Sequence, residues 1–331
     1  MVEQMFEQDK DNMRQVIGNF PSQFERGFKL ASHIRFDGVE SVVVAGMGGS
    51  AFYADLAKEW LGEELTVPLS VHRNYSLPAG VNEKTLFIAS SYSGNTEECL
   101  DGLEKALRIK AKIAGISSGG KVKEFCEKHS LPLALMPSGI QPRSSTGFMF
   151  SALIAILQNS RLIGGKSGEL SSLGSFLEAN KSALEHEGQK LAVAANGKIP
   201  VVYASQQYAS VARVCKIKFN ENSKTASFYN VFPELNHNEM NGTRFADKMH
   251  FFFIENPDDH PRVKKRMQVT RKLLESQGAG VSEITPLGKS RLERMFSALY
   301  LFEWASFHLA MEYGVDPTSV ELVEKLKKEL G

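Results

Sequence analysis

The chain has 331 residues, 42% of them hydrophobic, which is enough for the cores of two domains of ordinary size. The 39 basic and 38 acidic residues give a formal net charge of +1, which excludes a general attraction to nucleic acid or to an anionic membrane. Three widely spaced cysteines argue against a disulfide framework or a zinc site, and neither a signal peptide nor an apolar run of membrane-spanning length is evident. We therefore expect a cytoplasmic protein that binds a small molecule or another protein.

Strand-like and helix-like segments alternate along the first half of the chain. The helix-like segments carry apolar residues at helical spacing, as in AFYADLAKEWLG. The strand-like segments are short, apolar and often β-branched, and they span 41–46, 67–73, 84–90, 111–117 and 132–137. Strands separated by single helices predict a parallel sheet that is covered on both faces. The nearly apolar segment 146–164 then predicts a helix that is buried on most sides.

The second half follows the same order after a stretch rich in glycine, serine and charge. A strand at 198–206, a helix at 208–223 and a strand at 248–259 match the earlier pattern, so we expect a duplicated architecture. A long amphipathic helix ending at Gly314 comes next, and Asp316 is expected to cap a last helix. The apolar faces of these helices must be buried against other protein surface, which favours a homodimer.

These segments together predict an α/β protein of two three-layer domains with parallel sheets. We expect an N-terminal domain over 1–160, a helical linker over 161–190 and a C-terminal domain over 191–331. The first forty residues contain neither a helix-turn-helix pattern nor a basic extension, so nucleic acid is not an expected partner.

A glycine-rich turn, GMGGSA, joins the first predicted strand to the helix after it. Backbone amides at the start of a helix favour an anion, so Gly48, Gly49 and Ser50 are candidate binding residues. The spacing also fits a dinucleotide fingerprint, but the next strand ends in Arg73 instead of the acidic residue that binds a ribose. A structural interpretation also stands, in which the glycines allow a tight turn and Ser50 is a helix cap.

A second loop, SSYSGNT, carries hydroxyl side chains between the strand at 84–90 and a helix-like segment. Ser91, Ser93 and Thr96 can direct their hydroxyls towards one point, and a phosphate monoester accepts many such hydrogen bonds. The alternative is a capping box, in which Ser93 or Thr96 caps the helix with a nearby glutamate. Capping explains one hydroxyl but leaves the others unexplained, so phosphate binding is the preferred interpretation.

The two loops resemble the SIS domain, a sugar isomerase fold of flavodoxin-like α/β type, through their G-x-G-G-S and S-x-S-G-x-T motifs. This resemblance implies two flavodoxin-like SIS domains. It also implies that Ser91, Ser93 and Thr96 bind the phosphate of a phosphosugar. Some SIS domains are regulatory modules without chemistry, so the fold alone does not decide the function.

The segment at 216–242 contains the candidates for chemistry. Aldose and ketose phosphates interconvert when a carboxylate moves a proton between C1 and C2 through a cis-enediol, and a histidine suits the proton transfers on oxygen. Glu221 and His237 are such a pair, although Glu234 and Glu239 compete as bases on residue type alone. Both members of the pair also have ordinary interpretations, as a solvated helix carboxylate and a surface histidine.

Four motifs in the same order resemble the bifunctional phosphoglucose/phosphomannose isomerases of archaea and some bacteria: GMGGSA with SYSGNTEE, PRSSTG, FNENSK with PELNHNE, and GVDPTSVELVEKLK. The resemblance implies that Glu221 shuttles the proton between C1 and C2. It implies that His237 assists ring opening and acts across a homodimer interface, so that each active site is shared between subunits. Arg143 matches the arginine that stabilises the enediolate, and Lys327 matches a lysine that assists ring opening.

The expected activity is the interconversion of glucose 6-phosphate or mannose 6-phosphate with fructose 6-phosphate, without a metal or other cofactor. No His, Cys and Asp cluster with ligand spacing is evident, although His237 and Glu239 could suggest a metal pair. Two alternatives remain. One is another phosphosugar isomerase on the same fold, and the other is a non-catalytic SIS sensor of phosphosugars.

Overall fold

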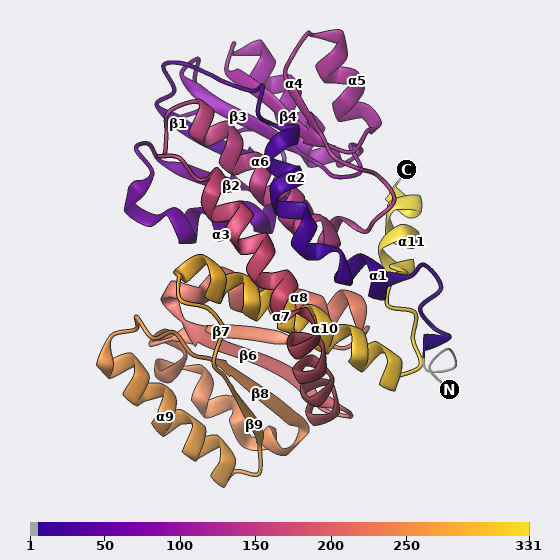
Figure 1. Cartoon of the computed structure of the whole chain (residues 1–331), viewed down its shortest axis with the longest axis vertical. Helices are drawn as coiled ribbons and strands as arrows, with labels where there is room; N and C mark the ends of the chain where they lie inside the picture. The colour runs from indigo at the N-terminus through magenta and orange to yellow at the C-terminus, as the bar shows by residue number, and fades with distance from the viewer. Residues whose placement is uncertain (1–5, 331) are drawn as a thin grey trace. The chain divides into compact units, whose positions relative to one another are not determined.

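A computed structural model describes residues 6–330 and contains two parallel sheets, each flanked by helices (Figure 1). By their internal contacts the residues group into two compact units, which we call unit 1 and unit 2. Among the described residues, unit 2 consists of residues 19–178, and unit 1 consists of residues 6–18 and 179–330. These limits differ from the expected domains because residues 6–18 group with the second half of the chain.

The sheet of unit 2 has five strands in the order β2-β1-β3-β4-β5, and every neighbouring pair is parallel. The strands are β1 (Ser41–Ala45), β2 (Leu69–His72), β3 (Thr85–Ser90), β4 (Lys112–Ser117) and β5 (Leu133–Leu135). All six residues of β3 are buried, as a central strand with helices on both faces requires. The predicted strands of the first half are therefore all present.

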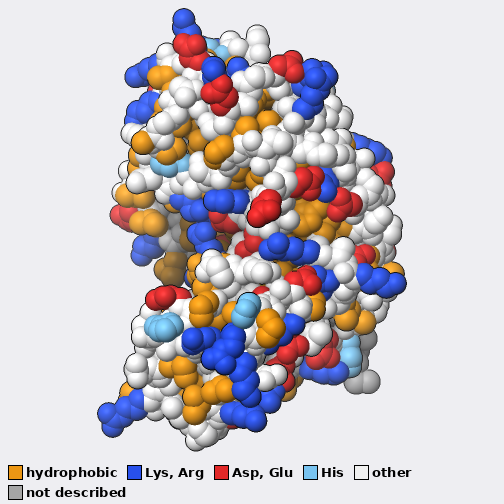
Figure 2. Space-filling view, turned by 90° about the vertical axis from the view of Figure 1, so that its left-hand side faces the viewer, with side chains coloured by type: hydrophobic (Ala, Val, Ile, Leu, Met, Phe, Trp, Pro, Cys, Tyr) orange, Lys and Arg blue, Asp and Glu red, His pale blue; other side chains and the backbone are white. Residues whose placement is uncertain are grey.

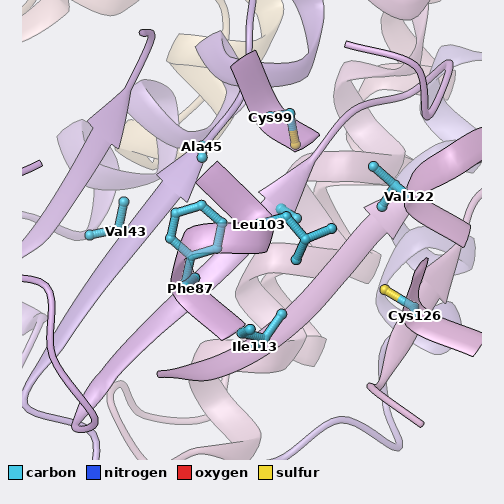
Figure 3. Close-up of a cluster of buried hydrophobic side chains, with 10 residues drawn as sticks. Val43, Ala45, Phe87, Cys99, Leu103, Ile113, Val122 and Cys126 are labelled. Atoms are coloured by element: carbon cyan, nitrogen blue, oxygen red, sulfur yellow. The ribbon is translucent and has the colours of Figure 1, made fainter. Parts of the chain in front are cut away.

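Helices cover both faces of this sheet, which gives three layers (Figure 1). The helices of unit 2 are α2 (Gln23–Leu30), α3 (Gly49–Leu61), α4 (Glu97–Arg108), α5 (Gly120–Lys128) and α6 (Thr146–Asn159). On one face Phe87 of β3 and Ile113 of β4 pack with Cys99 and Leu103 of α4 (Figure 3). The almost wholly buried α6 packs with α2 and α3, as its apolar sequence predicts.

The sheet of unit 1 has four parallel strands in the order β7-β6-β8-β9. The strands are β6 (Ile199–Ser205), β7 (Phe228–Phe232), β8 (Met249–Ile254) and β9 (Gly280–Ile284). The two α/β units confirm the predicted fold class. Two strands, β7 and β9, were not predicted from the sequence. Only their last residues, Phe232 and Ile284, are buried, so neither strand shows the long buried run of a central strand.

The helices of unit 1 complete its two outer layers. They are α1 (Met13–Gly18), α8 (Ala209–Asn222), α9 (Pro261–Ser276), α10 (Arg291–Glu312) and α11 (Glu321–Leu330), while α7 (Ser167–Ala195) begins in unit 2 and ends in unit 1. Phe252 of β8 stacks on Phe219 of α8 and meets Phe302 of α10 edge-on, so α8 and α10 share one face of the sheet. The other face packs against α9 through Met267 and Leu274.

The last helix begins later than predicted. Asp316 was expected to cap a helix that starts at Pro317, but α11 starts at Glu321. The Asp316 carboxylate instead accepts a hydrogen bond from the Thr318 N–H at 2.8 Å, which makes a turn ahead of the helix. In the part of the chain that the structure describes, no helix has the length and apolar character needed to cross a membrane.

Candidate active site

The glycine-rich turn and the hydroxyl loop lie side by side at the carboxyl edge of the sheet of unit 2. They follow β1 and β3, which are paired so that Ala45 lies opposite Ala89. The Tyr92 N–H donates to the Ser50 hydroxyl at 2.8 Å, and the Ser90 hydroxyl donates to the Ser50 carbonyl at 2.6 Å. The two motifs that the sequence singled out therefore form one connected structure.

The first turn presents the N-terminus of α3 at this edge. Gly48 precedes the helix with a φ of 48°, and the first N–H groups of any helix lack partners within the helix. Arg73, which could have bound the 2′-phosphate of a dinucleotide, forms an ion pair with Asp55. Gly48 and Gly49 thus remain candidate anion-binding residues, whereas the Ser50 N–H donates to the Met47 carbonyl at 2.9 Å and Arg73 already has a carboxylate partner.

The hydroxyls of the second loop divide into an inner and an outer set. Ser91 is fully buried, and its hydroxyl lies 2.8 Å from that of Thr96 and accepts the Gly94 N–H at 3.1 Å. Ser93 is exposed and Thr96 is half-buried. Thr96 is the N-cap residue of α4, yet its side chain makes no capping hydrogen bond. The capping interpretation therefore does not account for the Thr96 hydroxyl. The buried Ser91 hydroxyl instead contacts both the Thr96 hydroxyl and the Gly94 N–H.

Glycines hold this loop against the loop that follows β4. Gly94 has a φ of 75°, and its carbonyl accepts the Val122 N–H at 3.0 Å. A Cβ atom at Gly94 would overlap the Gly119 carbonyl, and one at Gly120 would lie 2.6 Å from the Ser93 carbonyl. Side chains larger than hydrogen would force the loops apart, so this contact fixes the position of the hydroxyls.

Arg143 lies in the interior of unit 2, next to the first turn. It belongs to a short 3-10 helix (Pro142–Ser145), and its side chain is only 1% exposed. A Cβ at Gly49 would come within 2.7 Å of the Arg143 N atom, so the turn packs directly on this segment. A surface ion pair was the ordinary interpretation of Arg143, and its burial excludes that. The backbone of Arg143 therefore lies against the glycine-rich turn, and its side chain is buried within unit 2.

Glu221 lies in the last turn of α8 in unit 1 and is half-buried. Its neighbour Lys216 donates to the Asn220 side chain at 2.8 Å, and Asn220 donates to the Thr225 carbonyl at 2.9 Å. Burial lowers the pKa of Lys216 and Arg213 lowers it further, while the charge of Glu221 raises it. The Glu221 carboxylate therefore lies within electrostatic reach of an ammonium group.

A set of polar contacts that the sequence did not reveal fixes the end of α8 on α10. Lys218 and Glu303 form an ion pair whose side chains are 3% and 10% exposed. The Asn222 amide donates to the Ser306 hydroxyl at 2.9 Å, and the Ser223 hydroxyl donates to the Ser306 carbonyl at 3.0 Å. We call these residues the α8–α10 clamp. Their only sequence signal is the presence of polar residues at helical positions that the apolar pattern marks as buried.

Within one chain, Glu221 and His237 lie at opposite edges of the sheet of unit 1. Because β6 and β7 are parallel, α8 must run back between them, and it ends near the amino edge where β7 starts. His237 follows β7 at the carboxyl edge and is exposed. A five-residue strand is about 15 Å long, so these two side chains do not meet in one chain.

The two competing carboxylates have other partners. Glu239 accepts from the Tyr203 hydroxyl at 2.6 Å and also from the Asn230 amide, and burial together with Glu239 raises the pKa of Tyr203. Each Glu239 oxygen therefore accepts a hydrogen bond, one from β6 and one from β7. This pairing argues against Glu239 and His237 as two ligands of a metal ion. Glu234 is exposed and accepts from Asn238 at 2.8 Å.

Lys327 is on α11, where its ammonium pairs with Glu324 at 2.7 Å. The side chain is 62% exposed, and every residue of α11 is exposed. Lys325 and Lys328 are exposed on the same helix. The contacts of α11 thus do not single out Lys327 among the three lysines.

Two family models match the chain. The model described as the bacterial phospho-glucose isomerase C-terminal SIS domain matches residues 184–330, and the SIS domain model matches residues 37–129. The second match contains β1 and β3 with both loops, and the first contains Glu221, His237 and Lys327. A solved structure of tagatose-6-phosphate ketose/aldose isomerase from Escherichia coli is similar in fold, with a TM-score of 0.72 at 17% identity over 92% of this chain and 94% of that one.

Relatives of known activity resemble the chain over nearly its whole length. A bifunctional phosphoglucose/phosphomannose isomerase from Caldicellulosiruptor bescii is 35% identical, with 96% of this chain and 98% of the relative covered. A D-glucosamine-6-phosphate 4-epimerase from Sulfolobus acidocaldarius is 30% identical, with 87% of this chain and 89% of the relative covered. The match to the isomerase is the more extensive of the two, and it agrees with both family models. The chain belongs to the bifunctional phosphoglucose/phosphomannose isomerase family of SIS-domain proteins.

Proposed function

We propose that the chain is an aldose–ketose isomerase that interconverts glucose 6-phosphate or mannose 6-phosphate with fructose 6-phosphate. The observation that carries the proposal is the 35% identity to an isomerase of that name across 96% of the chain. The connected turn and loop of unit 2 and the half-buried Glu221 of unit 1 supply the groups that the reaction needs. Glucose and mannose differ at C2, which becomes planar in the enediol, so one base serves both.

The phosphate of the substrate is proposed to bind at the carboxyl edge of the sheet of unit 2. Ser93 and Thr96 present hydroxyls to solvent there, Ser91 holds Thr96, and the N-terminus of α3 adds amides at Gly48 and Gly49. Ser50 joins the two motifs through Tyr92. Neutral donors suit a phosphate because they bind its oxygens without placing a fixed cation beside it.

Glu221 is the proposed base for the proton at C1 and C2. Removing this proton places negative charge on the oxygens of the enediolate, and the buried guanidinium of Arg143 is the proposed stabiliser of that charge. A carboxylate returns the proton to the neighbouring carbon without a metal. Lys327 is proposed to assist ring opening, on the strength of the family motif alone.

His237 is proposed to act from a partner subunit in a homodimer. In its own chain a strand separates it from Glu221, whereas a second copy can bring an exposed histidine to the base. The proposed location is the cytoplasm, where thiols stay reduced. Cys99, Cys126 and Cys215 are all free and buried, which suits that location.

The decisive experiment is incubation with mannose 6-phosphate and EDTA, followed by measurement of glucose 6-phosphate and fructose 6-phosphate. We expect both products, and proton exchange with deuterated water at C1 and C2. In Glu221→Gln, turnover should fall by at least about a hundredfold while phosphosugar binding is retained. The Glu234→Gln control removes a different, exposed carboxylate of unit 1 and should leave turnover unchanged. Turnover of Glu221→Gln near the wild-type rate would overturn the assignment of the base.

Sharing of the site between subunits is tested by mixing inactive variants. Glu221→Gln and His237→Ala homodimers should each be nearly inactive, and mixing them with exchange of subunits should restore part of the activity. One heterodimer site then has an intact base and an intact histidine. Absence of recovery, despite heterodimers seen by native mass spectrometry, would place both residues in the same chain's site.

The 30% identity to a glucosamine 6-phosphate epimerase favours one second candidate, a reaction on an amino-sugar phosphate. A panel that includes glucosamine 6-phosphate separates the two activities. An isomerase converts fructose 6-phosphate much faster than it changes the amino sugar. A chain that binds these sugars but exchanges no proton would be a sensor.

A further inference from the structure

Two stretches of the family motifs have no role in the proposed reaction. One is Lys224, the last residue of FNENSK, and the other is DPTS, residues 316–319, which precedes α11. Lys224 and Pro317 are 93 positions apart, yet the Lys224 ammonium donates to the Pro317 carbonyl at 3.3 Å. Both residues belong to unit 1. The structure therefore joins two motifs that are distant in the sequence.

The Lys224 ammonium also caps the helix that carries the proposed base. Helix α8 ends at Asn222, so its last carbonyls have no partner within the helix. The ammonium donates to the Glu221 carbonyl at 2.6 Å and to the Asn222 carbonyl at 3.4 Å. A cation is favoured at this negative end of the helix dipole. Together with Pro317 these carbonyls give the three N–H donors of the ammonium three acceptors.

The backbone at Lys224 has a conformation that suits glycine better than lysine. Its φ is 55°, in the left-handed region where glycine or asparagine commonly ends a helix. Gly314, with a φ of 63°, occupies the equivalent position after α10. A glycine at position 224 would make the same turn without strain, but it would lose all three hydrogen bonds of the ammonium. These bonds offset the strain of the lysine.

Other cations of the chain do not bond in this way. Lys110 has a φ of 57° at the same position after α4, but its ammonium has no hydrogen-bond partner among the described residues. Figure 2 shows Lys and Arg side chains gathered in its lower part, on the unit that carries the basic helix α9. The exposed Lys265 and Lys272 of α9 form no ion pair within the described part of the chain. The carbonyl contacts of Lys224 are therefore not a general property of lysines at helix ends or on this surface.

The segment that accepts the third hydrogen bond leads into α11. Pro317 and Thr318 of this segment are buried. Among residues 321–330 of α11 itself, none is buried. The helix that carries Lys327 is therefore held mainly through the segment that precedes it. Lys224 attaches this segment to the end of α8.

We infer that Lys224 is a positioning residue, which ties the backbone of the proposed base to the segment that leads into α11. The inference rests on the proposed function, because that function assigns Glu221 and Lys327 to one reaction. A single ammonium that holds the Glu221 and Pro317 carbonyls fixes the end of α8 relative to the start of α11. Lys224 contacts neither the sugar nor the phosphate in this role. Its loss should therefore lower kcat and leave KM nearly unchanged.

The test compares Lys224→Gly with Lys110→Gly in the full-length protein, by hydrogen exchange and by steady-state kinetics. Glycine accepts the positive φ at both positions, and the Lys224 side chain is exposed, so the change removes the ammonium without straining the backbone or the core. In Lys224→Gly, amide exchange in residues 315–330 should rise by about fivefold or more. Its kcat should fall by about tenfold, while the KM for fructose 6-phosphate stays within about twofold. Lys110→Gly should change none of these quantities.

Lys224→Arg is the rescue variant, because a guanidinium is also a cation with several donors. It should keep most of the kcat and the slow exchange of residues 315–330. Three outcomes would overturn the inference: exchange in Lys224→Gly no faster than in Lys110→Gly, an equal loss of kcat in Lys224→Gly and Lys224→Arg, or a higher KM with an unchanged kcat. If the wild-type chain isomerises no sugar phosphate, the proposed function fails, and the exchange comparison alone decides whether Lys224 holds the segment.

Discussion

The hydroxyl loop after β3 and the end of α8 are held in place by different kinds of contact. The loop is fixed mainly through its backbone: Gly94 packs against the Gly119 carbonyl, and the Gly94 N–H donates to the buried Ser91 hydroxyl. The turn of α8 that carries Glu221 is fixed through side chains, by the α8–α10 clamp. The proposed phosphate loop must present many donors at once, which a fixed backbone does, whereas the proposed base needs only a helix that cannot shift.

The largest effect on stability is expected from breaking the buried ion pair of the clamp. Lys218→Met leaves the Glu303 carboxylate nine-tenths buried without its cation. We expect the free energy of unfolding to fall by about 3–5 kcal/mol, as for other broken buried pairs. Urea unfolding measures this loss, and the kcat of any protein that remains folded should fall more than its KM rises.

A double variant separates the lost charge pairing from the lost packing. Lys218→Met with Glu303→Leu removes both charges and keeps similar volumes, so most of the lost stability should return. If the double variant is as unstable as Lys218→Met alone, the ion pair is not what holds α8 on α10.

The next largest effect is expected from the backbone contact of the loop. Gly94→Ala demands a positive φ from alanine and drives its Cβ into the Gly119 carbonyl. We expect a loss of at least about 2 kcal/mol in the free energy of unfolding, together with a higher KM for fructose 6-phosphate. The matched Gly38→Ala change also has a positive φ, but a Cβ there would meet no neighbour within 4 Å. An equal loss in both variants would mean that strain, and not the loop contact, is responsible.

The same comparison explains what could be predicted from the sequence. The fold class and both loops of unit 2 follow from local patterns, because a buried strand and its exit turn are contiguous in the chain. The sequence could not place Arg143 in the interior, since its burial depends on packing against Gly49, which is 94 positions earlier. Nor could it show that His237 and Glu221 lie at opposite edges, because β7 between them was not recognised.

The clamp was missed for a related reason. Lys218, Asn222 and Ser223 look like ordinary polar residues of a helix end, and their partners on α10 lie more than 80 positions away. Helical periodicity marks Lys218 as a core position, but it cannot name Glu303 as the partner. Contacts between distant polar side chains need three-dimensional packing, whereas motifs within one turn do not.

The smallest effect on stability, and the sharpest on binding, is expected from the outer hydroxyls of the loop. Ser93→Ala with Thr96→Ala leaves the backbone contact of Gly94 intact, so unfolding should change by less than about 1 kcal/mol. The KM for fructose 6-phosphate should rise by about tenfold or more, because each hydroxyl is proposed to donate to the charged phosphate, and kcat should change little.

The matched control for these hydroxyls is Ser118→Ala, which removes a neighbouring hydroxyl that donates to the Tyr92 carbonyl at 2.6 Å. It should leave the KM unchanged. Steady-state kinetics in both directions measure these constants. An unchanged KM in the Ser93→Ala, Thr96→Ala variant would mean that the backbone amides alone bind the phosphate. In that case the side chains of the loop would not bind the phosphate. The loop would then differ from the end of α8 only in being held by its backbone and not by side chains.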